Sequence, residues 1–320
     1  MKYFYFIILS VLYFACGFTP KKDAIRAQAS VITKTSLIIL GTVQDAGSPQ
    51  IACKKDCCKE LFMHPDENRK VVSLGIFDPK NDKKYLFDAT PDMVTQVKSL
   101  KEFAGEDSAE LPDAIFLTHA HIGHYTGLMY LGKEAMNAQK VPIYAMPRMH
   151  NFLVNNGPWS QLVNNENIQL ETLTANQNVP LTSNIEVVPF RVPHRDEYSE
   201  TVGYKIIGPN KKALFIPDID KWEKWDQDII NEIQEVDYAF IDGTFYDGVE
   251  INNRDISEIP HPFIIESMSL FSGLSPKEKG KVYFIHFNHT NPVLIPDSEQ
   301  SKTVEKNGFH IARKGQIFTM

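Results

Sequence analysis

Three histidines stand within six residues of the chain and follow directly on a short apolar run. The run is Ala-Ile-Phe-Leu at residues 114–117, and His119, His121 and His124 come just after it. Short apolar runs of this kind are typical of buried strands. His119 and His121 leave the strand end one residue apart, so their side chains point the same way. His124 then falls on the first turn of the next element. The pattern predicts three imidazoles that converge above a strand end.

Imidazole is a common neutral metal ligand, and two or three imidazoles at a rigid junction suit zinc or a similar borderline ion. The alternative is a surface loop that happens to carry three histidines. With only 10 histidines in 320 residues, a chance cluster this tight is improbable. The motif therefore favours a metal site, which its structural context has to support.

The length and composition favour a folded α/β protein. Of the 320 residues, 43% are hydrophobic and 23% are charged, which suffices for one large domain or two small ones with a proper core. The formal net charge of −7 gives no electrostatic footprint of the kind that nucleic acids require. We therefore expect a small-molecule substrate and no nucleic-acid partner, while the composition leaves the oligomeric state open.

The N-terminus has the pattern of an export signal. Lys2 precedes an apolar stretch, up to residue 17, that is too short for a comfortable membrane span. Ala15-Cys16 resembles a lipobox, in which Cys16 is lipidated after cleavage and tethers the protein to a membrane; cleavage after Ala29 and an uncleaved anchor are the alternatives. Each places the protein outside the cytoplasm, as a periplasmic protein or a membrane-anchored lipoprotein of a bacterium. We expect residues 1–29 to hold the signal and the start of a polar tether, and residues 30–320 to form a single domain.

The remaining cysteines, Cys53, Cys57 and Cys58, lie close together. Export permits disulfides, but three is an odd number and adjacent cysteines rarely pair with each other. Three thiolates within six residues favour a metal site that needs one further ligand. The alternative is one disulfide and one free thiol.

Apolar runs recur along the chain in two similar series. In the first half we expect strands at residues 36–41, 71–77, 84–88 and 141–145, and in the second half at 185–190, 203–207, 213–216, 238–241 and 282–285. Helices are expected at residues 127–137, 149–155 and 222–234. Two such halves predict two sheets packed face to face with helices outside, a four-layer α/β sandwich.

Acidic residues near strand ends have several possible roles. Asp220 is expected to cap a helix entered at Lys221, and the alternative is that it takes the place of Asp218 as a metal ligand. Asp242 either orients a metal ligand or fixes backbone amides. Asp88 and Asp92 are expected to be buried hydrogen-bonding or capping groups.

These motifs together resemble those of the metallo-β-lactamase-fold hydrolases. The similarity runs from about Leu37 to the C-terminus and is greatest to the branch with pyrroloquinoline quinone biosynthesis protein B and the phosphodiesterase of the carbon–phosphorus lyase pathway. Besides the histidine motif, it is carried by Gly-Ser-Pro-Gln at residues 47–50 with the cysteines after it, Asp-Ala-Thr-Pro-Asp at 88–92, Asp-Gly-Thr-Phe at 242–245 and His-Phe-Asn-His-Thr-Asn-Pro at 286–292.

The resemblance implies a two-metal site at strand ends. The family has a His-x-His-x-Asp-His motif, a later histidine, a bridging aspartate and a terminal histidine. By position, the first metal takes His119, His121 and His194, Asp218 bridges, and His124 and His286 serve the second metal. The likeness further implies that Asp218 orients the attacking water and shuttles its proton. His194, Asp218 and His286 each follow an apolar run, which agrees with the family pattern.

Two positions depart from the family pattern. Gly123 stands where the motif places an aspartate, so the second metal is expected to lack a carboxylate and to be held weakly. The quinone-biosynthesis protein typically lacks the first two motif histidines, whereas this chain has both His119 and His121. The second departure favours hydrolase chemistry over quinone biosynthesis.

The resemblance also implies a structural zinc. In the phosphodiesterase branch it is held by a cysteine cluster after the first strand and by a histidine three residues beyond the terminal metal-site histidine. The matching positions are Cys53, Cys57, Cys58 and His289. The family spacing is Cys-x-Cys-x-x-Cys, whereas Cys57 and Cys58 are adjacent, and adjacent side chains diverge unless the loop bends.

The sequence thus predicts an exported, metal-dependent hydrolase, in which the ion activates water and polarises the scissile group. Phosphodiesters are favoured as substrates by analogy with the phosphodiesterase branch. One or two zinc ions are expected at the catalytic site, with iron or manganese as alternatives. Two other functions stay open: an iron-dependent oxidation in pyrroloquinoline quinone biosynthesis, and metal binding without catalysis.

Overall fold

The apolar runs form the strands of two sheets in the computed structural model, which describes residues 32–252 and 255–320. Within these residues each sheet has seven strands. The first sheet contains β1 (Ser36–Gly41), β2 (Ser73–Asp78), β3 (Lys83–Phe87), β4 (Ala114–Phe116), β5 (Val141–Ala145), β6 (Ile168–Thr172) and β14 (Ile317–Thr319). The second contains β7 (Val179–Pro180), β8 (Glu186–Arg191), β9 (Val202–Ile207), β10 (Lys212–Ile216), β11 (Tyr238–Asp242), β12 (Val282–Ile285) and β13 (His310–Ile311).

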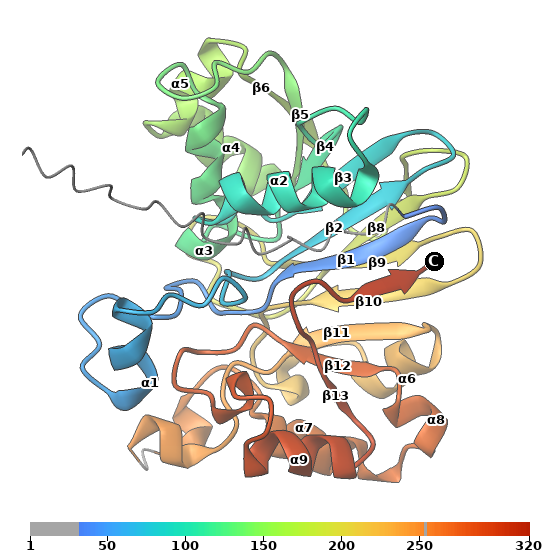
Figure 1. The fold of residues 1–320 in the computed structure, drawn as a ribbon. Helices are drawn as coiled ribbons and strands as arrows, with labels where there is room; N and C mark the ends of the chain where they lie inside the picture. The colour runs from blue at the N-terminus through green and yellow to red at the C-terminus, as the bar shows by residue number, and fades with distance from the viewer. Residues whose placement is uncertain (1–31, 253–254) are drawn as a thin grey trace, which may run out of the picture. The chain divides into compact units, whose positions relative to one another are not determined.

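The two sheets have similar topologies. The strand order is β14-β1-β2-β3-β4-β5-β6 in the first sheet and β13-β12-β11-β10-β9-β8-β7 in the second. In the first sheet, β14, β1, β2 and β3 pair antiparallel, whereas β3 to β6 pair parallel. In the second, β7 to β10 pair antiparallel and β10 to β13 pair parallel. Strand β14 returns from the end of the chain to pair with β1 (Figure 1).

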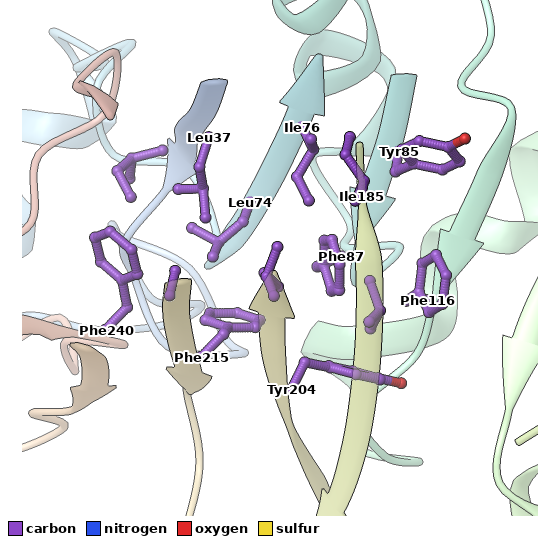
Figure 2. Close-up of a cluster of buried hydrophobic side chains, with 14 of the residues drawn as sticks. Leu37, Leu74, Ile76, Tyr85, Phe87, Phe116, Ile185, Tyr204, Phe215 and Phe240 are labelled. Carbon is purple, nitrogen blue, oxygen red and sulfur yellow. The ribbon is translucent and has the colours of Figure 1, made fainter. Parts of the chain in front are cut away.

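The residues of strand β1 show that both faces of the first sheet are buried. Leu37 and Ile39 belong to the cluster between the sheets, whereas Ile38 and Leu40 face the helices outside. A continuous apolar run is what a strand covered on both faces requires. Figure 2 shows the inner cluster, in which side chains of the two sheets face one another: Leu37, Leu74, Ile76, Tyr85, Phe87 and Phe116 from the first, and Tyr204, Phe215 and Phe240 from the second.

Helices cover the outer faces of both sheets (Figure 1). The first sheet packs against α2 (Met93–Ala104), α4 (Pro147–Asn155) and α5 (Trp159–Asn164), and the second against α6 (Ile229–Gln234), α7 (Ile264–Leu270) and α9 (Glu299–Lys306). The remaining helical segments are short: α1 (Asp56–Lys59), α3 (Ile122–Tyr125), α8 (Pro276–Lys279), and the 3-10 turns η1 (Glu60–Phe62), η2 (Thr126–Leu131), η3 (Trp222–Lys224), η4 (Gly248–Ile251), η5 (Ile256–Glu258), η6 (Phe271–Gly273) and η7 (Pro292–Leu294). The predicted four-layer α/β sandwich is therefore confirmed.

Two predicted helices are wrong in extent. The helix expected at residues 127–137 is present only as the 3-10 helix η2, which ends at Leu131. The chain then turns, and Gly132 O accepts hydrogen bonds from both Ala135 N and Asn137 N instead of continuing a helix. The helix expected at residues 222–234 is split into η3 and α6. The Asp228 side chain accepts a hydrogen bond from Ile230 N and so starts a new helix.

The predicted export signal lies outside the described residues. Cleavage and lipidation at Cys16 therefore stay predictions. In the part of the chain that the structure describes, helices are too short or too polar to cross a membrane.

Candidate metal centre

Four ligand atoms converge beyond the ends of β4, β8 and β10. His119 Nε2 lies 2.8 Å from His121 Nδ1 and 3.3 Å from Asp218 Oδ2. His194 Nε2 lies 3.3 Å from His121 Nδ1 and 3.2 Å from Asp218 Oδ2. The structure thus brings together all four residues expected around the first metal, and their role as ligands stays a prediction.

Backbone hydrogen bonds between the two halves explain why these residues meet. The chain after β4 is bonded to the segment around β9: Val202 N donates to Thr118 O (3.1 Å), and Ala120 N donates to Ser199 Oγ (2.8 Å). These bonds hold the histidine motif of the first half against the strand ends of the second half. Residues that are distant in sequence therefore share one site.

A second group of ligand atoms also includes Asp218. Ligand atoms of Asp218, His124, His286 and Asp45 all lie within 4.8 Å of one another. Asp45 Oδ1 is 2.8 Å from His124 Nε2 and 3.5 Å from His286 Nε2. Asp218 Oδ2, which faces the first group, is also 3.9 Å from His286 Nε2. Asp218 therefore lies where a bridging ligand is expected.

Asp45 is a residue that the sequence analysis missed. We expected Gly123 to leave the second metal without a carboxylate and weakly held. Asp45 places a carboxylate among the ligand atoms of this group, and how strongly a second metal is held stays a prediction. Asp45 follows strand β1 in the chain, as Asp218 follows β10. The strand-end rule that singled out Asp218 could therefore also have found Asp45.

His261 is a second missed residue. Its Nδ1 lies 2.8 Å from Asp242 Oδ2 and 3.2 Å from Asp218 Oδ1, and its side chain is buried. It forms a further group of converging ligand atoms with Asp218, Asp242 and His286. Because His261 lies between η5 and α7 rather than after an apolar strand, the strand-end pattern did not indicate it.

Oxygen atoms hold the Nδ1 atoms of three histidines. Asp88 Oδ2 lies 2.7 Å from His124 Nδ1, and Asp220 Oδ1 lies 3.2 Å from His194 Nδ1. The third contact is between Thr244 Oγ1 and Nδ1 of His286, at 2.8 Å. Such partners fix the orientation and tautomer of a ring whose other nitrogen binds a metal.

These contacts bear on the roles left open for the acidic residues. Asp88 is a buried hydrogen-bonding group, as expected. The capping role expected for Asp220 is wrong, because η3 has Lys221 at its N-cap and no side-chain cap. Asp242 fixes a backbone amide, as one of its two expected roles requires, and its role in orienting a metal ligand stays a prediction. It accepts a hydrogen bond from Ile219 N at 3.2 Å, and it accepts another from the Thr244 hydroxyl at 2.7 Å.

Some groups of the centre have the protonation states of metal ligands, and two histidines do not. Burial opposes ionisation of Asp218, but His194, His261 and His286 hold its pKa well below the usual range. Burial also opposes ionisation of Asp45, but His124 and His286 hold its pKa well below the usual range. Burial and the nearby His124 keep the pKa of His119 well below its ordinary value. Ionised carboxylates and a neutral imidazole are the forms that bind metals.

Although burial opposes protonation, Asp88 and Asp45 raise the pKa of His124 well above its ordinary value, and Asp218 raises the pKa of His194 to about 10. A metal ion that binds these rings would displace their protons.

Two residues of the centre have a left-handed backbone conformation. Asp88 and His286 both have φ of 67°, and each directly follows a strand. Such a conformation costs about 1–3 kcal/mol for a residue other than glycine and concentrates at functional sites. The turn at the strand end directs each side chain into the centre.

Two buried atoms of the centre test whether a metal fits. His124 Nε2 and Asp218 Oδ1 have no hydrogen-bond partner in the described structure. A buried polar atom without a partner is unfavourable, and a metal ion would satisfy both. Two tetrahedral ligands at about 2.1 Å from one zinc lie about 3.4 Å apart, close to the separations found here. The nitrogen and carboxylate donors suit zinc, iron or manganese.

The cysteine cluster has the arrangement expected for a structural zinc. Ligand atoms of Cys53, Cys57, Cys58 and His289 lie within 4.8 Å of one another. Helix α1 bends the loop, so the adjacent thiols do not diverge: Cys57 Sγ and Cys58 Sγ are 4.0 Å apart. Tetrahedral thiolates at about 2.3 Å from zinc lie about 3.8 Å apart. The three cysteines are free, without the disulfide of the alternative.

Comparison with known proteins shows the family to which this chain belongs. The family model described as a β-lactamase superfamily domain matches residues 83–287. Coenzyme PQQ synthesis protein B of Methylorubrum extorquens is 23% identical over 300 residues, which cover 87% of this chain and 98% of the relative.

Two solved structures share the fold. Zn²⁺-bound PqqB from Methylobacterium extorquens superposes with a TM-score of 0.74 at 23% identity, over 89% of this chain and 100% of that one. A diphosphatase from the PhnP family superposes with a TM-score of 0.61 at 20% identity, over 89% of this chain and 96% of that one.

Proposed function

Because the chain belongs to the metallo-β-lactamase superfamily, we propose that it is a metal-dependent hydrolase of a phosphodiester or a related small substrate. The observation that carries this proposal is the position of Asp218. Its Oδ2 atom faces His119 and His194 of one ligand group and His286 of the other. A carboxylate shared by two groups of ligands is the arrangement of a two-metal hydrolytic site.

The residues of the centre have separate roles in this proposal. His119, His121 and His194 hold the first ion, and His124 and His286 serve the second. When bound, the ions supply a Lewis acid that lowers the pKa of water and polarises the scissile group. The pKa of Asp218 lies well below the usual range, so the residue is a carboxylate that can accept a hydrogen bond from the attacking water and orient it, and His261 Nδ1 lies 3.2 Å from its Oδ1.

Zinc is the proposed ion, at the centre and at the cysteine cluster. The presence of zinc in the PqqB structure supports this choice, as do the nitrogen, oxygen and sulfur donors of the two clusters. The donors of the centre also suit iron and manganese. Elemental analysis of protein purified without added metal separates these ions.

The phosphodiester class is supported by the fold shared with a diphosphatase. The test is a substrate panel at neutral pH with phosphodiester, diphosphate, thioester and β-lactam substrates. Release of product from phosphodiesters, abolished by a chelator, supports the proposal. Hydrolysis confined to thioesters or β-lactams contradicts the substrate class, and no hydrolysis by the metal-loaded protein contradicts the activity.

The second candidate is a role in pyrroloquinoline quinone biosynthesis. The similarity to coenzyme PQQ synthesis protein B over 98% of that protein favours it. Iron in the purified protein, together with a neighbouring gene for a quinone-precursor peptide, would support this role over hydrolysis. Bound metal with neither activity would leave a metal-binding protein.

We further propose that the protein is exported and tethered through Cys16. The N-terminal pattern alone supports this proposal. Membrane fractionation of cells tests it, because Cys16→Ser should release a lipoprotein from the membrane fraction. Unchanged partition of the variant would contradict the lipid tether.

A further inference from the structure

We propose that Asp45 is the carboxylate ligand of the second ion, in place of the aspartate that the family motif carries at position 123. This inference rests on the proposed metal-dependent function and adds a ligand from a different part of the chain. The motif aspartate would come from the turn after β4, whereas Asp45 comes from the loop after β1.

Asp45 lies at ion-pair distance from one histidine of the second group and close to another, where a cation could take the place of a proton. Its Oδ1 lies 2.8 Å from His124 Nε2, yet His124 Nε2 has no hydrogen-bond partner in the described structure. The two atoms therefore converge without the alignment of a hydrogen bond. The same Oδ1 lies 3.5 Å from His286 Nε2. An ion between these three atoms would satisfy all of them.

Gly123 provides the space that Asp45 occupies. A Cβ atom placed on Gly123 would lie 2.4 Å from Asp45 Cα and 2.5 Å from Asp45 Oδ1, closer than real Cβ contacts. Gly123 does not have a positive φ, so its backbone conformation does not require glycine. The glycine is therefore explained by the close approach of Asp45, by its backbone as well as its side chain. An aspartate at position 123 and Asp45 in its present place exclude each other.

The backbone holds Asp45 close to His286. Gln44 N donates to Phe287 O, and Phe287 N donates to Thr42 O, each at 2.8 Å. These bonds join the chain just before Asp45 to the residue that follows His286. The positions of Asp45 and His286 are set together before an ion binds, as a preorganised site requires.

The test counts the ions that the purified protein binds. Apo-protein is titrated with Co²⁺, whose visible absorption reports the ligand field, and bound metal is measured by elemental analysis. The wild-type centre should take two ions. Asp45→Asn should bind the second ion at least about tenfold more weakly and keep the absorption of the first.

Two further variants sharpen the test. Asp66→Asn removes an exposed carboxylate from the surface hollow that Asp45 also lines, and it should leave both ions bound. Gly123→Asp should not strengthen binding, because its side chain meets Asp45.

Several results would overturn the inference. Wild-type affinity for the second ion in Asp45→Asn refutes the role of Asp45 and leaves the hydrolase proposal intact. A wild-type centre that takes one ion also refutes it. A centre that takes no ion refutes both proposals. If Asp45→Asn does not fold, Asp45→Ala decides: wild-type affinity for the second ion in folded Asp45→Ala counts against the inference.

Discussion

The Oδ2 atom of Asp88 lies 2.7 Å from Nδ1 of His124, and both side chains are completely buried. The other carboxylate oxygen accepts hydrogen bonds from the backbone and hydroxyl of Thr118, at 2.8 and 3.0 Å. Asp88 therefore joins the end of β4 to the ring of His124 and leaves Nε2 of that ring facing Asp45. The buried carboxylate holds the ligand in its binding orientation.

Asp88→Asn should weaken metal binding or activity by about 10- to 100-fold, because an amide cannot replace both accepting oxygens. Asparagine tolerates the positive φ at this position, so backbone strain should not change much. Metal content and hydrolysis are measured together. Glu110→Gln, at an exposed ion pair with Lys98, is the control and should behave as the wild type. Wild-type metal affinity and activity in Asp88→Asn would contradict the role of Asp88.

His121→Ala should remove activity together with most of the metal at the centre, because it deletes one of three imidazoles around Asp218. His150→Ala is the matched control, since His150 contacts Thr172 on the surface and lies outside the ligand groups. Elemental analysis and a hydrolysis assay give the readout. Full activity with unchanged metal content in His121→Ala would show that the site is assigned wrongly.

Cys57→Ser and His289→Ala should each release one zinc and lower the midpoint of thermal unfolding, while the metal of the centre stays bound. The cluster joins the loop after β1 to the segment after β12, so its binding free energy stabilises the fold. Calorimetry and elemental analysis measure the two effects. His64→Ala, an exposed histidine close by in the sequence, is the control. Retention of every zinc ion by both variants would refute the structural site.

Glu250→Gln should change how stability depends on pH. Burial raises the pKa of Glu250 to about 7, although hydrogen bonds from Tyr246 and Thr290 oppose the shift. The folded state therefore holds this proton more tightly than the unfolded state, whose glutamate pKa is about 4.3. The free energy of unfolding should fall as pH rises from about 4.5 to 7. Glutamine does not titrate. The midpoint of thermal unfolding of the variant, relative to that of the wild type, should therefore rise from pH 5 to pH 8. The same difference in unfolding midpoint between variant and wild type at pH 5 and at pH 8 would contradict this prediction.

Strand-end histidines and aspartates were predictable from the sequence because a buried strand makes a clear apolar run. His119, His194 and Asp218 each follow such a run, and the structure places them together. Asp45 was missed because the family motif shows only that Gly123 stands in place of an aspartate. It does not show which residue elsewhere in the chain could supply a carboxylate. The substitute comes from another loop, and only the three-dimensional contacts join the two positions.

Other features had no local pattern to reveal them. His261 lies in a loop between short helical segments, and its burial depends on contacts with Asp218 and Asp242. The helix expected after the histidine motif stops at Leu131, because Gly132 O accepts hydrogen bonds from Ala135 N and Asn137 N in a turn. Strand β6 was not predicted, since it lies at the sheet edge, only its first residue, Ile168, is buried, and it includes polar side chains.

Metal-dependent hydrolysis is tested most directly by restoring the metal to inactive protein. Apo-protein is titrated with Zn²⁺, and the hydrolysis of bis(4-nitrophenyl) phosphate is followed at each addition. We predict that the rate rises in proportion to the ions bound at the centre and that His121→Ala shows no such rise. A centre that refills with zinc and yet hydrolyses no phosphodiester would contradict the proposed function.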